Sequence, residues 1–335
     1  MIYYENHSRD PAFNMAVEEA LLASAGEEPL FLLWQNSPAV ILGRHQDARR
    51  EVDLAYAQQE GIAVIRRLSG GGAVYHDAGN LNYTFILPRC GGESKTVSSD
   101  EFRLWSKPVL DVLREMGVNA EFSGRNDLTV GGRKISGTAQ AMLYGHLLHH
   151  GTLLLSTDFG KMSRVLRVDA EKLRGKGVAS VRSRVANLSE SIPVDAERMK
   201  QAILGKIAEE NPLTCRTFSP VLIGEIERLK REKYTLPAWN LGEPLETPSC
   251  TAVTRRKRFA WGEVQVTLQL DGEVVAGAVM TGDFFADRSP SLLTEKWVGS
   301  PYSRAALEER IEQSDLEKVF SGLKKAELLD LLFQP

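Results

Sequence analysis

The chain has 335 residues, of which 43% are hydrophobic and 25% are charged, a composition typical of a folded globular protein with more than one domain. Its formal net charge of −3 gives no electrostatic reason to expect nucleic acid or an anionic membrane as the main partner. The three cysteines, Cys90, Cys215 and Cys250, are far apart, which argues against a disulfide framework. No export signal or bilayer-spanning apolar run is visible, so we expect a soluble cytoplasmic protein.

The first part of the chain predicts one helix and a series of short strands. Asp10 followed by Pro11 is typical of a helix N-terminus, and apolar residues continue at helical spacing to Ser24. Beyond it we expect strands over 30–34 and 39–42 joined by a turn, a helix over 53–59, a buried strand over 62–66 and another strand over 81–87.

The remainder of the chain predicts a second half of the same domain and then a smaller one. We expect helices over 100–116, 195–209 and 221–232, strands over 118–122, 126–130 and 147–156, and a hairpin turn at Gly131-Gly132. A second hairpin is expected around Asp271-Gly272, followed by helices over 303–313 and 323–333. The pattern predicts a large mixed α/β domain over 1–240, a linker over 241–256 and a small α+β domain over 257–335.

The glycine-rich segment RRLSGGGAVYHDAGN, residues 66–80, is the first candidate for chemistry. Three glycines after a buried strand let the backbone approach a ligand and turn its N–H groups toward an anion, and Arg67 beside them offers a bidentate phosphate contact. A glycine triplet alone is more often a flexible turn, and neither of the common phosphate-binding glycine motifs is present. The segment by itself therefore leaves both readings open.

Three further segments carry candidate side chains. GRNDL and RKISGTA, at 124–128 and 133–139, place Lys134 just after a hairpin turn, where its compact charge suits a phosphate or carboxylate. Asp127 either holds a metal ion or caps a turn. HHGTLL, at 149–154, lacks the spacing of a metal site, so hydrogen-bonded histidines on a strand are expected. The glycine-bearing basic loop at 176–184 taken alone is a mobile surface loop.

Taken together and in this order, the four segments resemble the lipoate–protein ligase A family. The N-terminal strings DPAFNMAVEEALL and LFLLWQNSPAVILGRHQ are similar to that family as well. The resemblance covers residues 1–190 densely and the remainder more loosely. It implies a fold shared with biotin ligases, a mixed sheet flanked by helices, together with a small C-terminal accessory domain. It also implies that ATP and Mg²⁺ are used to convert lipoate into lipoyl-AMP.

The resemblance also assigns roles by position. It implies that Lys134 is the catalytic residue and touches both nucleotide and lipoate. The residues implied to bind ATP are Arg67, Gly72, Ala73, Val74, Tyr75, Asn126, Asp127, Lys134 and Arg182, with Asp127 also a metal candidate. The residues implied to bind lipoate are Trp34, Ser69, Gly71, His76, Asn80, Lys134, Ala139 and His150. Trp34 is equally compatible with a place in the hydrophobic core. The implied partners are apo lipoyl carrier domains, namely those of 2-oxoacid dehydrogenase E2 subunits and the glycine cleavage H protein.

Three other functions are alternatives to this one. The first is a lipoyl or octanoyl transferase of the same superfamily that lacks its own adenylation activity; one branch of such enzymes uses a nucleophilic cysteine, and here no cysteine falls within the matched segments. The second is a DNA-binding regulator, for which the cation run Arg255–Arg258 is the supporting feature, although such runs are usually solvated. The third is a lipoate-binding protein without catalysis, which the presence of every nucleotide-side residue disfavours.

Overall fold

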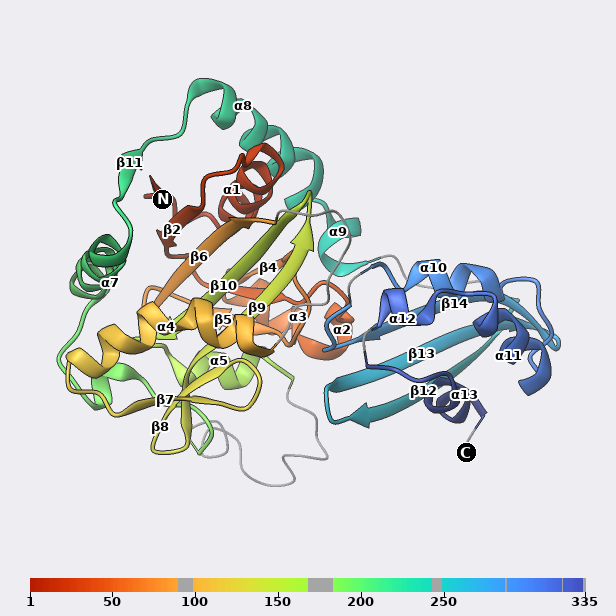
Figure 1. Cartoon of the computed structure of the whole chain (residues 1–335). Helices are drawn as coiled ribbons and strands as arrows, with labels where there is room; N and C mark the ends of the chain where they lie inside the picture. The colour runs from red at the N-terminus through yellow and green to blue at the C-terminus, as the bar shows by residue number, and fades with distance from the viewer. Residues whose placement is uncertain (90–98, 168–182, 243–248, 287, 321, 334–335) are drawn as a thin grey trace. The chain divides into compact units, whose positions relative to one another are not determined.

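A computed structural model of the protein describes residues 1–89, 99–167, 183–242, 249–286, 288–320 and 322–333 (Figure 1). The chain divides into two compact units. The first consists of Met1–Leu42, Ala48–Ser69 and Ala73–Leu241, and the second of Gly43–Asp47, Gly70–Gly72 and Gly242–Pro335. The second unit thus includes two short segments from early in the chain, a feature that sequence patterns did not predict.

An eight-stranded mixed sheet forms the centre of the first unit, with strand order β11-β1-β2-β6-β10-β9-β8-β7 (Figure 1). Its strands are β1 (Ile2–Glu5), β2 (Leu30–Trp34), β6 (Asn80–Pro88), β7 (Ala120–Ser123), β8 (Asp127–Val130), β9 (Arg133–Leu143), β10 (His146–Leu154) and β11 (Thr214–Arg216). Strand β1 runs parallel to β2 and β11, and the other neighbouring strands are antiparallel. The expected mixed sheet flanked by helices is therefore confirmed.

A second, three-stranded sheet lies within the same unit. Its strands are β3 (Ala39–Leu42), β4 (Ala63–Arg66) and β5 (Val74–His76), and β3 pairs parallel with β4 and antiparallel with β5. The expected strands at 30–34 and 39–42 both exist, but they belong to different sheets. In the turn between them the chain passes from the large sheet to the small one. The glycine-rich segment connects β4 to β5.

Helices cover both faces of the large sheet. On one face α4 (Ser99–Glu115) and α7 (Ala196–Glu210) contribute to a cluster with the sheet, and on the other α1 (Pro11–Ser24) and α8 (Pro220–Leu229) do so. Helix α1 begins as expected, because the Asp10 carboxylate accepts hydrogen bonds from the N–H groups of Ala12 and Phe13. The smaller elements are α2 (Ala48–Glu51), α3 (Leu54–Gln59), α5 (Phe159–Val165), α9 (Pro237–Leu241), a 3₁₀ turn at Leu188–Glu190 and a π-helical turn at Lys230–Tyr234.

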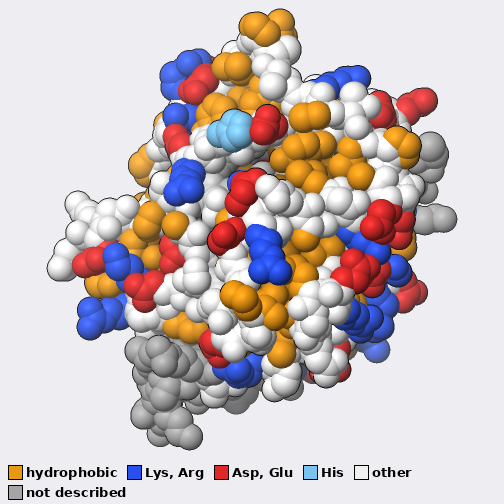
Figure 2. All heavy atoms as spheres, turned by 90° about the vertical axis from the view of Figure 1, so that its left-hand side faces the viewer, with side chains coloured by type: hydrophobic (Ala, Val, Ile, Leu, Met, Phe, Trp, Pro, Cys, Tyr) orange, Lys and Arg blue, Asp and Glu red, His pale blue; other side chains and the backbone are white. Residues whose placement is uncertain are grey.

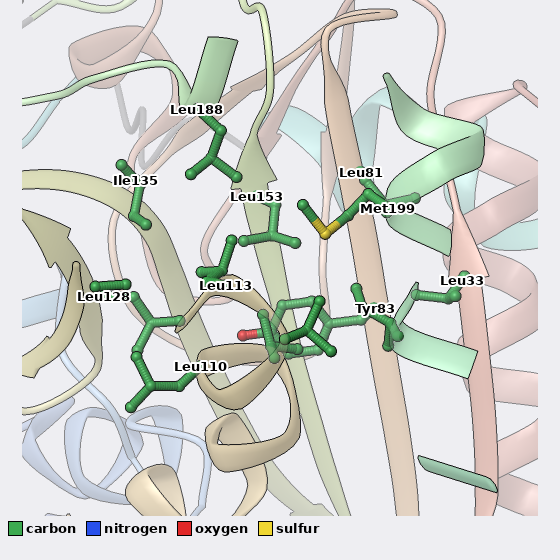
Figure 3. Close-up of a cluster of buried hydrophobic side chains, with 14 of the residues drawn as sticks. Leu33, Leu81, Tyr83, Leu110, Leu113, Leu128, Ile135, Leu153, Leu188 and Met199 are labelled. Carbon is green, nitrogen blue, oxygen red and sulfur yellow. The ribbon is translucent and has the colours of Figure 1, made fainter. Parts of the chain in front are cut away.

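The face covered by α4 and α7 is mostly apolar. Figure 3 shows Leu110 and Leu113 of α4 in one cluster with Leu81, Tyr83 and Leu153 of the sheet. Burial raises the pKa of the Tyr83 phenol to about 12, so this hydroxyl stays protonated. Packing of this face contributes to the hydrophobic stabilisation of the first unit, as does the apolar cluster beneath α1.

The second unit contains an antiparallel three-stranded sheet with helices. Its strands are β12 (Thr251–Phe259), β13 (Gly262–Asp271) and β14 (Val274–Gly282), and its helices are α10 (Ser291–Thr294), α11 (Arg304–Glu312), α12 (Leu316–Val319) and α13 (Lys325–Phe333), with a 3₁₀ turn at Glu295–Trp297. The hairpin expected at Asp271-Gly272 is confirmed as the connection from β13 to β14. The second unit therefore has the α+β composition expected of it.

The linker expected over 241–256 was too long, because residues 251–256 form the first part of β12. This strand lies at the edge of its sheet and exposes alternate residues, which made its sequence look like a polar connection. The cation run Arg255–Arg258 lies within it. Arg258 pairs with Asp283, with a nitrogen–oxygen distance of 3.2 Å, which gives part of this run a structural role.

The described helices include none that is long and apolar enough to cross a membrane. On the face drawn in Figure 2, acidic and basic side chains are interspersed with apolar ones. This distribution agrees with the small net charge of the chain.

Gly79 should be required for stability, because an added Cβ there would lie 2.4 Å from backbone atoms of Ser156. The Gly79 carbonyl also accepts hydrogen bonds from the N–H groups of Leu155 and Ser156, so neither segment can easily move away. We expect Gly79→Ala to cost at least ~1–3 kcal/mol of unfolding free energy, as overpacking does. Denaturant unfolding will measure this. Gly205→Ala, on α7 with open space around it, is the control and should be neutral or stabilising; equal stability of the two variants would contradict the prediction.

His149 should make the fold sensitive to acid. Its ring packs against Phe102, and burial lowers its pKa from 6.5 to about 3. Between these two pH values the unfolded chain binds a proton that the folded chain does not, so stability is full above pH 6.5 and falls as the pH drops. We expect a loss of up to ~1.4 kcal/mol per pH unit from this one histidine.

Urea unfolding at pH 7.5 and pH 5 will measure the effect. In His149→Gln the difference between the two pH values should shrink. His7→Gln, which changes a histidine with an 80% exposed side chain, should leave the difference as it is in the unmodified chain. The same pH dependence in all three proteins would rule His149 out as its source.

Candidate active site

The direction of the Lys134 side chain is set by an irregularity in strand β9. Leu128 of β8 faces Ser136, and Thr129 faces Lys134, so Ile135 is an extra residue on β9. Such a bulge changes which face the neighbouring side chains take. Ile135 enters the apolar core with 1% exposure, while Lys134 points toward Asp127 and Gly137.

The Lys134 amine lies 2.7 Å from Oδ1 of Asp127. The two side chains are 36% and 34% exposed, so the pair is open to a ligand. The backbone of Lys134 is held as well: its N–H donates to the Arg184 carbonyl at 2.8 Å, and its carbonyl accepts from the Ala186 N–H at 2.9 Å. Hydrogen bonds therefore hold the backbone of Lys134 in place, while its amine stays accessible to a ligand.

Asn126 and Thr138 hold the two strands together beside this ion pair. The Thr138 N–H and hydroxyl both donate to the Asn126 carbonyl, and the Asn126 side-chain amide donates to the Thr138 carbonyl. Asn126, expected to contact the nucleotide, thus also forms part of the frame around Lys134.

A buried polar cluster lies further along β9 and β10. His150 stands opposite Ala139, and its Nδ1 lies 3.0 and 3.1 Å from the two carboxylate oxygens of Glu18. Its Nε2 lies 2.6 Å from Ser69 Oγ, which also accepts a hydrogen bond from Arg67 Nε at 3.0 Å. Every group has a partner if Ser69 donates to Nε2 and the Nδ1–H donates to Glu18.

The Glu18 carboxylate has a second set of partners. Thr84 donates its hydroxyl to Glu18 at 2.6 Å and accepts from the Trp34 indole N–H at 2.9 Å. Trp34 is only 3% exposed and packs in the cluster beneath α1, so the structure gives it a core position with a polar contact. Trp34 therefore takes the core position, and its contact with lipoate stays a prediction.

His76 is tied into a neighbouring network. Thr152 donates its only hydroxyl hydrogen to Asn82 at 2.7 Å, so it must accept from His76 Nε2–H at 3.0 Å. The other ring nitrogen accepts from the Asn36 side-chain amide at 3.0 Å. Burial lowers the pKa of His76 to about 3, which agrees with a neutral ring held in one tautomer.

Arg67 is more enclosed than a typical phosphate-binding arginine. It is 6% exposed, and its guanidinium donates to the Ile41 carbonyl as well as to Ser69. Burial lowers its pKa to about 10, while the charge of Glu18 acts in the opposite direction. The side chain therefore remains a cation at neutral pH, and it supports the buried cluster.

The other expected ATP-binding positions lie in and after the glycine-rich segment. Gly72 belongs to the second compact unit, as does Gly71, which is expected to bind lipoate. Ala73 and Val74 are half-buried, and Tyr75 is buried in the core of the small sheet with Val40. Burial raises the pKa of the Tyr75 phenol. Tyr75 has its side chain in that core, so a contact with a nucleotide at this position would involve the backbone.

Two further expectations concern Asn80 and Arg182. Asn80 is buried, donates to Thr157 Oγ1 at 2.9 Å and accepts from the Asp77 N–H, so it stabilises the turn before β6. Arg182, like most of the basic loop at 176–184, lies outside the described residues. Of the described part of the chain, no three His, Cys, Asp or Glu side chains come together as a metal site.

Sequence reasoning missed several residues that the structure places in this site. Glu18 is the most important, and its signal was a carboxylate within the apolar face of α1, between Val17 and Leu21. Thr84, Thr152 and Gly137 were missed because each lies on a strand where its type is unremarkable. The site as described combines the accessible amine of Lys134 with a buried polar cluster around Glu18 and His150.

Comparison with known proteins identifies the family of the chain. Residues 10–208 match the family described as lipoyl protein ligase A/B catalytic domain, and residues 248–332 match the bacterial lipoate protein ligase C-terminus. Lipoate–protein ligase 1 of Staphylococcus aureus is 36% identical over 330 residues, which is 98% of each chain.

Two solved structures are similar in fold and sequence. One is of a bipartite archaeal lipoate protein ligase and its E2 lipoyl domain from Thermoplasma acidophilum, with 31% identity and a TM-score of 0.64 over 74% of this chain and 98% of the other. The second is of lipoate–protein ligase A bound with ATP, with 29% identity and a TM-score of 0.62 over 72% of this chain and 98% of the other. The chain therefore belongs to the lipoate–protein ligase family.

Proposed function

We propose that the chain activates lipoate with ATP to form lipoyl-AMP and then transfers the lipoyl group to a lysine of a carrier domain. The observation that carries this proposal is the accessible Lys134 amine, held 2.7 Å from Asp127, on the strand that also leads to the buried cluster around His150. The family membership and the relative bound with ATP support the same reaction.

Lys134 would act by bringing two anions together. When a carboxylate attacks an α-phosphate, the repulsion between the two groups must be neutralised and their geometry fixed. A single ammonium reaches both groups, and the open side of the Lys134–Asp127 pair leaves room for them. In this mechanism the protein supplies charge and position, and no protein nucleophile takes part.

The remaining residues divide between the two substrates. We propose that Arg67, Gly72, Ala73, Val74, Tyr75, Asn126, Asp127 and Arg182 serve the nucleotide, with Lys134 shared. We propose that Trp34, Ser69, Gly71, His76, Asn80, Ala139 and His150 serve the lipoate. Several of these side chains have internal partners, such as Trp34 with Thr84, so their role would be to shape the pocket rather than to bind through a free group.

The protein ligand that we propose for Mg²⁺ in this site is Asp127. Asp127 is the carboxylate beside Lys134, and the described residues contain no cluster of three metal-binding side chains there. Magnesium is commonly held by one or two carboxylates together with substrate phosphates and water, so a single Asp127 oxygen is compatible with it. When bound, the ion would neutralise charge on the pyrophosphate side.

The carrier would be a lipoyl domain. The archaeal relative is described with its E2 lipoyl domain, and we propose E2 domains and the glycine cleavage H protein as the substrates of this chain. We also propose that residues 1–240 form the catalytic domain and that the C-terminal part of the chain, from β12 onward, forms an accessory domain. The match of residues 248–332 to a separate C-terminal family supports this division.

Lys134→Ala should abolish lipoyl-AMP formation and leave the fold intact. The ion pair that it removes is partly exposed, and such pairs contribute ~0–1 kcal/mol to stability. Lipoate-dependent ATP–pyrophosphate exchange will measure the reaction, and thermal unfolding will check the fold. Lys161→Ala, which removes an exposed lysine paired with Glu60, is the matched control and should retain activity. Near-normal exchange by Lys134→Ala would defeat the assignment.

Incubation of the protein with lipoate, Mg-ATP and a panel of apo carrier domains will test the whole reaction. We expect the mass of the E2 domain and of the H protein to increase by one lipoyl group only when ATP is present. Modification that requires pre-formed lipoyl-AMP, with no pyrophosphate exchange, would instead identify a transferase without adenylation activity. No modification under either condition would contradict the proposal.

A further inference from the structure

Gly137 stands directly beneath the amine of Lys134. It faces Asp127 across the β8–β9 pair. A Cβ added at Gly137 would lie 2.5 Å from Lys134 Nζ, 2.6 Å from Cε and 3.5 Å from Asp127 Oδ1. The end of the lysine side chain therefore occupies the space that any other residue at 137 would fill.

The bulge at Ile135 explains why these residues meet. In a regular strand residues three apart point to opposite faces, so Lys134 and Gly137 would be on different sides of the sheet. The extra residue restores them to one face. The lysine side chain then runs along its own strand and reaches Asp127 over the glycine.

The frame around this contact is fixed. Asn126 and Thr138 join β8 to β9 on one side, and the carbonyl of Arg184 and the N–H of Ala186 hold the Lys134 backbone on the other. The terminal part of the lysine is flexible, and it is the nearest group to the missing Cβ. A methyl group at position 137 would therefore displace the amine and leave the strands in place.

Other closely packed glycines meet different neighbours. At Gly151 an added Cβ would lie 2.4 Å from the phenol of the buried Tyr83, and at Gly79 it would lie 2.4 Å from the Ser156 backbone. Those neighbours cannot move aside cheaply, so these two glycines serve packing. Among the three, Gly137 is the one whose obstacle is the mobile end of a side chain in the candidate site.

We infer that Gly137 is a positioning residue. Its lack of a side chain leaves the Lys134 amine in the position where it can contact the lipoate carboxylate and the α-phosphate of ATP together. The inference rests on the proposed function, since it concerns the same lysine. Because a displacement of ~1 Å can cost on the order of 100-fold in rate, one methyl group here should be enough to impair adenylation.

Gly137→Ala tests the inference in the full-length protein. Initial rates of lipoate-dependent ATP–pyrophosphate exchange should show kcat reduced on the order of 100-fold, as for a misplaced catalytic group, with smaller changes in the KM values for ATP and lipoate. Gly205→Ala, with open space at its Cβ, is the matched control and should keep the kcat of the unmodified chain.

A stability cycle with Lys134→Ala separates positioning from packing. Removing the lysine side chain removes the obstacle, so any loss of thermal stability in Gly137→Ala should disappear when the same change is made in the Lys134→Ala background. In the Gly137→Ala protein, labelling of Lys134 by an amine-reactive ester, measured by peptide mass spectrometry, should also differ from that in the unmodified chain.

Each outcome has a distinct meaning. If the unmodified chain shows no exchange, the proposed function fails. If it does and Gly137→Ala retains kcat within about threefold of it, a change too small for a displaced catalytic group, the inference is overturned while the function stands. The inference is also overturned if Gly137→Ala destabilises the Lys134→Ala background as much as the unmodified chain, because the obstacle is then not the lysine.

Discussion

The enclosed carboxylate of Glu18 sets the conditions for the polar half of this site. A carboxylate that is 2% exposed is tolerated only when it is paired and hydrogen-bonded, because the loss of water around an ion is costly. Glu18 is satisfied by His150 and Thr84, and these residues in turn orient Ser69 and Trp34. Arg67 lies close by, so the positive charge of this buried guanidinium balances the negative charge of the buried Glu18 carboxylate.

The two faces of the large sheet consequently have different roles. The face under α4 and α7 carries leucines, Tyr83 and the neutral His149, and its packing stabilises the unit. The face under α1 carries Thr84, Asn82, His150 and Thr152, whose hydrogen bonds are directed. Alternation along β6 and β10 produces both faces from the same strands, so residues of the candidate site and residues of the apolar core occur in adjacent positions.

Sequence patterns predicted those parts of the fold that depend on local chemistry. Helix α1 follows from its Asp10 cap, and the hairpins follow from glycine pairs and Asp271-Gly272, since these preferences operate within a few residues. The separation of 30–34 and 39–42 into two sheets was not predictable, because it depends on partners far along the chain. The edge strand β12 was hidden by its polar exposed face.

The candidate site was predictable to a smaller extent. The family resemblance predicted Lys134, Ser69 and His150 as site residues. The structure places Ser69 Oγ 2.6 Å from His150 Nε2. Glu18 was missed because an acidic residue on a helix is usually solvated, although its place within the apolar face of α1 was a signal of burial. The bulge at Ile135 was equally hidden, because register is a property of a strand pair and not of a single sequence.

The pairing of Lys134 with Arg184 and Ala186 joins positions about fifty residues apart in the chain. Strand β10 pairs with β9 only from Ser136 onward, so this later segment covers the edge of β9 that β10 leaves open. During synthesis the lysine leaves the ribosome well before the segment that completes its backbone hydrogen bonds. Until then the edge has an unsatisfied donor and acceptor, and a chain cut short before residue 184 would keep it exposed to pairing with other chains.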